Sequence, residues 1–449
     1  MQVPKGPAEI IKELRKAGYE AFAVGGCVRD SLLERTPNDW DLCTSALPRQ
    51  VKTVFEGKLR QRDIGIAHGT ITLLSSDGPV EVTTYRQDGR YTDHRRPDNV
   101  ILGVSLEEDL ARRDFTINAM AMDSDGEIRD PFGGRRDLEA RIVRCVGDPV
   151  KRFSEDALRI LRALRFASQL NFEIDPDTLR AARKCAPLLE RISRERVFQE
   201  LDRMLLGPGA GRILSQSGEI LAEVIPPIGR TLNFDLKSQM HDRDLWQHTA
   251  AAVSFSPPIR EVRWALLLHD LAKPDCFTVD ARGIGHARDH GPKGSEMAEQ
   301  LLRNLRAPNR LTSPVRLLVR YHDFPIAPKE NSVRRWLARL GPDLLQKLIL
   351  VKRADLAAHA DRPEVAKRRS QVESFEKLIK QVAATHPCLR LEDMAVNGRD
   401  LIRSGICLPG PRTGRMLRKL LFAIIEGQVQ NNREDLLEFA QTLSQEQEE

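Results

Sequence analysis

Two patterns of hydrophobic and polar residues divide the chain. Near the N-terminus the apolar runs are short and rich in β-branched residues: "EAFAVGG" (20–26), "GIAHGTITLL" (65–74) and "GPVEVTTYR" (78–86), the last two separated by the turn signal "SSDGP". From "DPVKRFSEDALRILRALRFA" (148–167) onward, apolar residues recur with the 3.6-residue period of a helix. The pattern predicts an α+β fold, with a strand-containing head followed by an all-helical remainder.

Glycine and proline mark the expected joints of the helical part. They lie at "GDPV" (147–150), at "GPGAG" (207–211) and, less sharply, near "HADRPEVAKRRS" (359–370). We therefore expect four parts: a head (1–148), a neck (149–215), a body (216–365) and a tail (366–449).

Composition narrows the class of protein. The chain has 449 residues, 41% of them hydrophobic and 30% charged, which is typical of a soluble globular protein. No apolar run reaches the ~18–20 residues of a membrane helix, and the N-terminus has the pattern of an amphipathic helix rather than a signal peptide. Seven cysteines without a close pair favour reduced thiols and a cytoplasmic location. The net charge of +6 permits a nucleic-acid partner without requiring one.

Two acids and two glycines near the first strand carry candidate chemistry. In "NDWDLC" (38–43), Asp39 and Asp41 would point to one face if the segment is a strand. Carboxylates held side by side repel one another and suit Mg²⁺, with Glu81 as a possible third acid. Gly25 and Gly26 would let a triphosphate approach the backbone of the next helix. An exposed turn with two solvated acids is the alternative that the acid pair alone leaves open.

Three long motifs carry a resemblance to a known family. They are "GGCVRDSLLERTPNDWDLCT" (25–44), "EVTTYRQDGRYTDHRRPDNVILGVSLEEDLARRDFTINAMAMD" (81–123) and "DPFGGRRDLEARIVRCVGDP" (130–149). In this order they resemble the class II tRNA nucleotidyltransferases and bacterial poly(A) polymerases, whose head is similar to DNA polymerase beta. Glu34 departs from the family, which most often has glycine there.

The resemblance implies template-independent addition of CCA to the 3′ end of tRNA from CTP and ATP. Asp39, Asp41 and Glu81 would then be catalytic, the first two holding Mg²⁺ for two-metal nucleotidyl transfer. Arg113 would meet phosphate oxygens, Asp114 would accept from ribose hydroxyls, and Asn118 would brace their loop. The full set of nucleotide-binding candidates is Gly25, Gly26, Arg29, Arg113, Asp114, Asn118, Asp156, Arg159 and Arg162.

Asp156 and Arg159 are the candidates for choosing the base. Lying three residues apart in "SEDALRILRALRFA" (154–167), they would share one face of a helix. Cytosine and adenine both present an amine donor beside a ring-nitrogen acceptor, whereas uracil and guanine present the reverse, so a carboxylate beside a guanidinium matches only C and A. The resemblance adds Glu155 as a positioning residue, and Glu195 with Arg196 as braces. A surface ion pair is the alternative for such spacing.

One loop bears on which nucleotides the protein adds. The loop "RQDGRYTDHRRPDN" (86–99) resembles the flexible loop tied to terminal adenosine addition and is intact. A poly(A) polymerase, or a partial enzyme that adds only C-C or only A, stays open as an alternative.

In the tail, Arg412, Arg415, Arg418 and Lys419 follow the turn "LPGPRTG" and could contact the tRNA backbone, or form a solvated face.

The helical body carries a second set of candidate ligands. Histidines with carboxylates suit a divalent transition metal, and adjacent His-Asp in an apolar helix is unusual. Their order resembles the HD phosphohydrolase superfamily, which implies a tentative HD site and a possible phosphohydrolase activity toward phosphomonoesters or 2′,3′-cyclic phosphates. A metal-free body that only supports tRNA, or an HD phosphohydrolase whose head only binds RNA, are the alternatives. The ligand candidates are His248, His269, Asp270, His290, His322 and Asp355.

Overall fold

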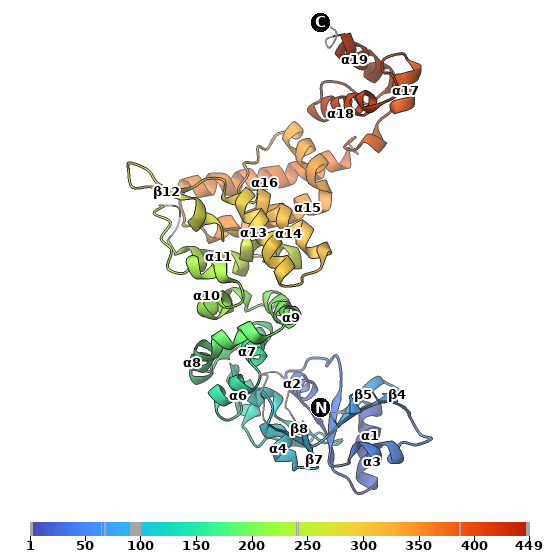
Figure 1. The fold of residues 1–449 in the computed structure, drawn as a ribbon, viewed down its shortest axis with the longest axis vertical. Helices are drawn as coiled ribbons and strands as arrows, with labels where there is room; N and C mark the ends of the chain where they lie inside the picture. The colour runs from blue at the N-terminus through green and yellow to red at the C-terminus, as the bar shows by residue number, and fades with distance from the viewer. Residues whose placement is uncertain are drawn as a thin grey trace. The chain divides into compact units, whose positions relative to one another are not determined.

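The computed structural model describes residues 3–63, 65–66, 69–89, 100–238, 240, 242–385 and 388–445 (Figure 1). The chain forms two compact units. Unit 1 comprises Met1–Gly229 with Asn304–Ala307, and unit 2 comprises Arg230–Arg303 with Pro308–Glu449.

A seven-stranded sheet forms the head of unit 1. Its order is β3-β4-β5-β2-β1-β8-β9, and its neighbours are antiparallel except for the parallel pair β2 and β5. Along the chain the strands are β1 (Ala21–Val24), β2 (Asp41–Thr44), β3 (Arg60–Arg62), β4 (Thr70–Ser75), β5 (Gly78–Thr84), β8 (Ala121–Met122) and β9 (Ile128–Arg129). β1 is buried along its whole length, which explains its unbroken apolar sequence.

The parallel pair places two acids side by side. In the register between β2 and β5, Asp41 is the partner of Glu81. Because neighbouring strands lie about 4.8 Å apart, this register alone brings the two residues together from positions forty residues apart in the chain.

Short helices cover and connect the sheet. Helices α1 and α3 pack against each other and against sheet strands, and α2 packs on β1 (Figure 1). The head helices are α1 (Lys5–Lys16), α2 (Gly26–Leu32), α3 (Pro48–Val54), α4 (Leu106–Ala111) and α5 (Gly134–Glu139). Two short strands, β6 (Arg86–Asp88) and β7 (Val100–Leu102), pair outside the sheet.

Helices continue unit 1 after the head. They are α6 (Pro149–Glu155), α7 (Leu158–Leu170), α8 (Pro176–Cys185), α9 (Arg194–Leu205) and α10 (Ala210–Ala222). Helix α7 packs closely against α9 and is buried on most of its surface. A two-stranded parallel pair, β10 (Ile142–Val143) with β11 (Glu173–Ile174), links the end of the head to these helices.

Unit 2 is almost entirely helical. Its helices are α11 (Leu245–Phe255), α12 (Arg260–Leu268), α13 (His290–Asn304), α14 (Asn309–Tyr321), α15 (Glu330–Ala358), α16 (Pro363–Ala384), α17 (Gly398–Arg403), α18 (Pro411–Glu426) and α19 (Arg433–Gln445). Helices α11, α12, α14 and α15 pack on one another. A hairpin of β12 (Phe277–Val279) and β13 (Gly285–Ala287) interrupts them.

The α+β class predicted from the sequence is confirmed, with a strand-containing head and a helical remainder. The structure adds strand β11 and the β12–β13 hairpin to the part predicted to be wholly helical. Both pairs have strands of only two or three residues, too short to leave an alternating pattern in the sequence.

Glu34 occupies the position where a helix end favours glycine. It follows α2 with φ +56°, and the N–H of Arg35 donates to Asp30 O over 2.8 Å. The N–H of Glu34 itself donates to Ser31 O, which completes a Schellman helix end. The left-handed conformation of this motif explains why glycine suits the position.

The described residues contain no helix that is long and apolar enough to cross a membrane. All seven cysteines are free, as predicted from their spacing.

Candidate functional site

The glycine turn after β1 lets an arginine approach the backbone. Gly25 has φ +82° and ψ −130°, a conformation that is rare for residues with a side chain. A Cβ atom at Gly25 would lie 3.0 Å from Arg113 Nη1, closer than such contacts normally come. The backbone conformation therefore favours glycine at this position, and any other residue would also crowd Arg113.

Three acids meet at the start of β2. Strand β2 begins at Asp41, so Asp39 lies just outside it. The expectation that both aspartates belong to one strand and share its face is therefore wrong. The carboxylates nonetheless interact. Asp41 is partly open to solvent. Partial desolvation and the negative charges of Asp39 and Glu81 nevertheless raise its pKa to about 6, and the positive charge of Arg113 opposes this shift only weakly.

One cavity of about 490 Å³ brings the predicted nucleotide-binding residues together. Its volume is in the range of small-molecule sites. All nine of the predicted nucleotide-binding residues line it, together with Asp41. The complete lining is Gly25, Gly26, Arg29, Asp41, Arg112, Arg113, Asp114, Asn118, Asp156, Arg159, Arg162, Arg165, Phe166, Arg196 and Arg203.

A buried aspartate that the sequence did not single out fixes two of these arginines. Asp109 is fully buried and accepts from Arg112 Nη2 at 2.8 Å and from Arg113 Nη2 at 3.2 Å. Burial by itself would raise the pKa of Asp109, but the two guanidinium groups more than offset it and hold the pKa below its usual value. Arg113 is thus held in place by a permanently charged partner.

Asp114 lies at the centre of a second network. Its Oδ2 accepts from Arg162 Nε at 2.7 Å, and its Oδ1 accepts from Asn118 Nδ2 at 3.2 Å. Asn118 Oδ1 in turn accepts from Arg29 Nη1 at 2.7 Å. Burial opposes ionisation of Asp114, yet Arg162 and Asn118 hold its pKa at about 2. Asn118 therefore links Asp114 to Arg29 in this network.

Asp156 and Arg159 lie on either side of a helix break. Helix α6 ends at Glu155, and Asp156 has the extended angles φ −137° and ψ 103°, so the prediction that the two residues share one helix face is wrong. The cause is local: Asp156 Oδ1 accepts the N–H of Leu158, the first residue of α7, at 3.0 Å. Aspartate commonly makes this contact at helix starts.

Neighbouring charges hold both residues at the cavity. Glu155 Oε2 accepts from Arg159 Nη1 at 2.7 Å, and Arg196 Nη2 donates to Asp156 Oδ2 at 3.2 Å. The positioning expected of Glu155 and Arg196 is therefore present. Glu195 instead lies 3.8 Å from Arg306.

Phe166 is a part of the site that sequence reasoning missed. Three guanidinium groups surround its ring, with centroid distances of 5.0 Å for Arg29, 5.4 Å for Arg162 and 4.1 Å for Arg165. Arg165 also pairs with the buried Glu200 at 2.7 Å. These cation–π contacts hold arginines side by side in spite of their like charge. The signal in the sequence that could have pointed to this part of the site was the row of arginines spaced three residues apart in α7.

The cavity lining carries a large excess of positive charge. Eight arginines line it against three aspartates. An anionic ligand with several charged oxygens, such as a triphosphate, would balance this excess.

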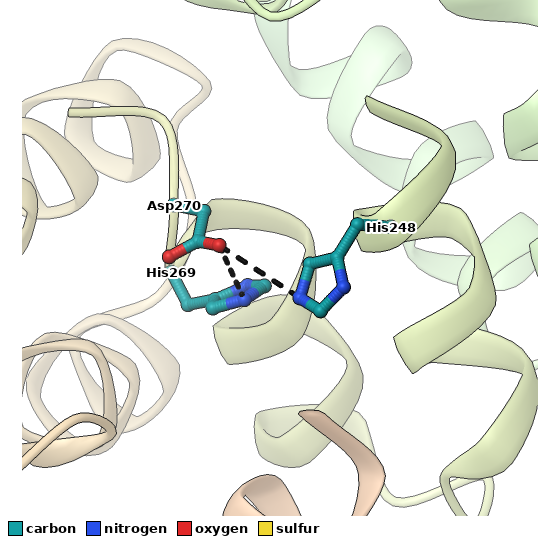
Figure 2. Close-up of side chains that lie close together, drawn as sticks. All are labelled: His248, His269 and Asp270. Carbon is teal, nitrogen blue, oxygen red and sulfur yellow. Dashed lines mark ion pairs between the residues drawn. The ribbon is translucent and has the colours of Figure 1, made fainter. Parts of the chain in front are cut away.

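Unit 2 brings together all six predicted ligand candidates from separate helices. His248 lies in α11, His269 and Asp270 directly follow α12, His290 begins α13, His322 follows α14 and Asp355 lies in α15. His248, His269 and Asp270 form one group that could hold a metal ion, and Asp270, His290 and His322 form another. Figure 2 shows the first group, with Asp270 facing both histidines.

Asp270 offers a different oxygen to each group. Its Oδ2 lies 3.1 Å from His269 Nε2 and 3.9 Å from His248 Nε2 (Figure 2). Its Oδ1 lies 3.5 Å from His290 Nε2 and 3.4 Å from His322 Nε2. Asp355 joins the first group, with its Oδ1 2.9 Å from His248 Nε2.

Backbone carbonyls fix the orientation of the histidine rings. The Nδ1 atoms of His269, His290 and His322 lie 2.6–2.7 Å from carbonyl oxygens three residues earlier, so each Nδ1 carries a proton and donates. In the neutral rings, the Nε2 atoms of His290 and His322 then face each other with lone pairs over 3.0 Å. Such an arrangement is repulsive, and either a proton on one of the two nitrogens or a metal cation beside them relieves the repulsion.

The donor set therefore fits metal ions. Within the described part of the chain, the buried His269 Nε2 and Asp270 Oδ1 have no hydrogen-bond partner. Orphaned buried polar atoms are costly, and a divalent cation would satisfy both. Histidine ligands whose other nitrogen donates to a carbonyl are typical of metal centres.

Two further residues of this cluster were not predicted. His359 groups with His248 and Asp355, and Lys273 donates to Asp270 Oδ2 at 2.6 Å. Both lie on the same side of their segment as a predicted ligand, His359 four residues after Asp355 and Lys273 three after Asp270. That spacing was the signal that could have found them.

The remaining predicted regions lie outside these two clusters. Of the loop 86–99, residues 90–99 lie outside the described residues. The basic tail residues Arg412, Arg415, Arg418 and Lys419 are exposed on α18.

Comparison with known proteins first defines the class. The family model of the poly A polymerase head domain matches residues 21–144, and that of the probable RNA- and SrmB-binding site of polymerase A matches residues 171–216. A putative tRNA nucleotidyltransferase domain 2 matches residues 293–440. The head is thus that of a nucleotidyltransferase.

Relatives along the whole chain define the family. The CCA-adding enzyme of Leuconostoc mesenteroides is 36% identical over 435 residues, covering 96% of this chain and 94% of the relative. That of Geobacillus thermodenitrificans is 36% identical over 442 residues, covering 98% and 97%. The crystal structure of the Bacillus stearothermophilus CCA-adding enzyme in complex with CTP superposes with a TM-score of 0.75 and 31% identity, covering 98% of this chain and 97% of that one. The chain belongs to the family of CCA-adding enzymes.

Replacing Asp41 by asparagine should stabilise the cation-free protein at neutral pH. The raised pKa means that the folded state binds a proton more tightly than the unfolded chain, so ionised Asp41 destabilises the fold increasingly as the pH rises from about 4 through about 6. In EDTA, the unfolding midpoint of Asp41→Asn should therefore exceed that of the wild type by more at pH 8 than at pH 5. An equal or smaller difference at pH 8 would show that the pKa of Asp41 is not raised in the folded protein.

Proposed function

We propose that this protein adds C, C and A to the 3′ end of tRNA, taking the nucleotides from CTP and ATP without a nucleic-acid template. One observation carries the proposal: all nine nucleotide-binding candidates and the catalytic candidate Asp41 line the same cavity of unit 1. The named activity of the relatives supports it over the full length of the chain.

The acids at the start of β2 would hold the divalent cations that nucleotidyltransferases use. The fit rests on the chemistry of the donors, because carboxylate oxygens suit Mg²⁺, and desolvation together with the negative charges of Asp39 and Glu81 raises the pKa of Asp41 in spite of Arg113. Asp39, Asp41 and Glu81 are the proposed holders. Mg²⁺ bound there would supply Lewis-acid activation of the tRNA 3′-hydroxyl and of the leaving pyrophosphate.

The arginines of the cavity bind and orient the triphosphate. Asp109 holds Arg113, and Asn118 with Asp114 holds Arg29 and Arg162, so these side chains are in place before a nucleotide enters. A site ordered in advance loses less entropy when it binds its ligand. Gly25 leaves room for this approach beside Arg113.

Asp156 and Arg159 choose the base. Each has fixed protein partners, and both line the cavity, so a carboxylate acceptor and a guanidinium donor face the ligand in a defined arrangement. Cytosine and adenine match this pair of groups, whereas uracil and guanine would leave buried polar groups unpaired at about 1–3 kcal/mol per group. The helix break at Asp156 places its carboxylate at the cavity.

The exposed basic residues of α18 would contact the tRNA backbone in the cytoplasm. Arg412, Arg415, Arg418 and Lys419 form an exposed cationic row on this helix. Contacts of this kind add salt-dependent affinity without reading sequence.

We propose hydrolysis of phosphomonoesters or 2′,3′-cyclic phosphates as a second activity, carried by unit 2 as an HD-type domain. The observation that favours it is the pair of ligand groups sharing Asp270, with the Nε2 atoms of His290 and His322 only 3.0 Å apart. Divalent transition metals held by His248, His269, Asp270 and Asp355, and by Asp270, His290 and His322, would supply Lewis-acid catalysis. A cavity of about 290 Å³ adjoins the cluster, and Lys273, Arg288 and Arg368 in its lining suit a phosphate group.

The proposed addition predicts a defined product. Given a tRNA that lacks its 3′ CCA, the protein should add C from CTP alone and stop at three nucleotides, C-C-A, when CTP and ATP are both present. UTP and GTP should be incorporated poorly. Product lengths on a sequencing gel measure this. Long A tails would indicate a poly(A) polymerase, and arrest after C-C a partial enzyme.

Removing the base-reading pair should relax nucleotide choice. In Asp156→Ala and in Arg159→Ala, the ratio of kcat/KM for CTP over UTP should fall by roughly 10-fold to 100-fold, because cytosine loses one matched hydrogen bond and uracil loses one mismatch. Arg113→Ala is the matched control from the same cavity: it should lower kcat/KM for all four nucleotides alike. Unchanged discrimination in both alanine variants would refute the assigned roles.

The second activity should depend on the ligand cluster of unit 2. With Mn²⁺ or Ni²⁺, the wild type should release phosphate from 2′-AMP and open 2′,3′-cyclic AMP, and His269→Ala should lower both rates by about 100-fold or more. CCA addition by His269→Ala serves as the control and should persist, because the cavity of unit 1 is unaltered. Hydrolysis that survives in His269→Ala would assign the activity elsewhere.

A further inference from the structure

Lys273 contacts the carboxylate that links the two ligand groups of unit 2. Its ammonium nitrogen lies 2.6 Å from Asp270 Oδ2, and its side chain is only 13% exposed. The same oxygen lies 3.1 Å from His269 Nε2 and 3.9 Å from His248 Nε2. A cation bound by this group must therefore share Asp270 Oδ2 with a fixed positive charge.

We propose that Lys273 sets the affinity of this site for divalent cations by competing for Asp270 Oδ2. The inference rests on the proposed cation site of unit 2 and assigns a role to a residue outside its ligands. Two like charges on one carboxylate oxygen repel, and the repulsion is strong because the oxygen is buried. Whether Lys273 shares the oxygen with the cation or is displaced from it, its charge weakens binding.

The same contact stabilises the protein when no cation is bound. The side chain of Asp270 is only 1% exposed, and an unpaired carboxylate buried this deeply would strongly destabilise the fold. Burial opposes the ionisation of Asp270, and the charges of His269 and Lys273 more than offset it, which holds its pKa well below the usual value. Lys273 thus acts as a built-in counter-charge.

Lys273 thus weakens cation binding but stabilises the cation-free protein. This combination of opposite effects distinguishes competition from other roles for the lysine. A lysine that only supported the fold would, when replaced, lower stability and weaken cation binding together. A lysine that served only to orient the carboxylate for a metal would also weaken binding when lost. Competition alone predicts lower stability without the cation and tighter binding with it.

The test uses the full chain in an Asp41→Asn background, which removes one of the three proposed cation ligands of unit 1 and so weakens binding there. Free Mn²⁺ is followed by electron paramagnetic resonance during titration, and the unfolding midpoint is measured in EDTA. Adding His269→Ala to the background gives the baseline for unit 2. Lys273→Gln keeps a hydrogen-bond donor and removes the charge, and the exposed Lys293→Gln is the matched control.

Lys273→Gln should bind Mn²⁺ about tenfold more tightly than the background chain and unfold at a lower temperature in EDTA. Lys293→Gln should change neither quantity. Lys273→Met should shift Mn²⁺ binding in the same direction and replaces Lys273→Gln if that variant does not fold.

Two negative results would be distinguishable. If the background chain binds Mn²⁺ above the His269→Ala baseline and Lys273→Gln binds it equally or more weakly, the competition is refuted while the cation site stands. If neither chain binds Mn²⁺ above that baseline, the cation site is refuted, and the role of Lys273 with it.

Discussion

The cavity of unit 1 depends on how its arginines are shared among carboxylates. Asp109 and Asp114 are buried, yet guanidinium groups hold their pKa values below the usual range, and in return each aspartate fixes arginines at the cavity wall. Arginine is suited to this role because it stays charged and donates in a fixed planar geometry. The result is a cationic site whose side chains are in place before any phosphate binds.

The carboxylates that arginines do not neutralise are the proposed cation ligands. Asp41, in register with Glu81, has a raised pKa in a cavity otherwise dominated by positive charge. In unit 2, Asp270 and Asp355 lie among histidines, with Lys273 as the one lysine that contacts Asp270 in the described part of the chain. The two units thus surround their carboxylates differently: in unit 1 most of the partners are arginines, and in unit 2 most of them are histidines, whose ring nitrogens suit a transition metal.

The α+β class and the grouping of both candidate sites could be predicted from the sequence, because long motifs and an ordered set of His and Asp residues carry that information. The local geometry of the proposed base-reading pair, Asp156 and Arg159, could not be predicted. A spacing of three predicted one helix face for Asp156 and Arg159, whereas the carboxylate of Asp156 captures a backbone N–H and ends the helix. Asp109, Phe166 and Lys273 were missed because their roles come from contacts to other candidates, which appear only when separate segments pack together.

In the proposed mechanism, side chains of unit 1 alone choose the nucleotide, before RNA is bound. The direct measurement is the Kd of each of the four nucleoside triphosphates for the wild-type protein without tRNA, by equilibrium titration with Mg²⁺ present. CTP and ATP should bind about tenfold or more tightly than UTP and GTP. Equal affinities for all four would contradict it, since the choice would then require the RNA.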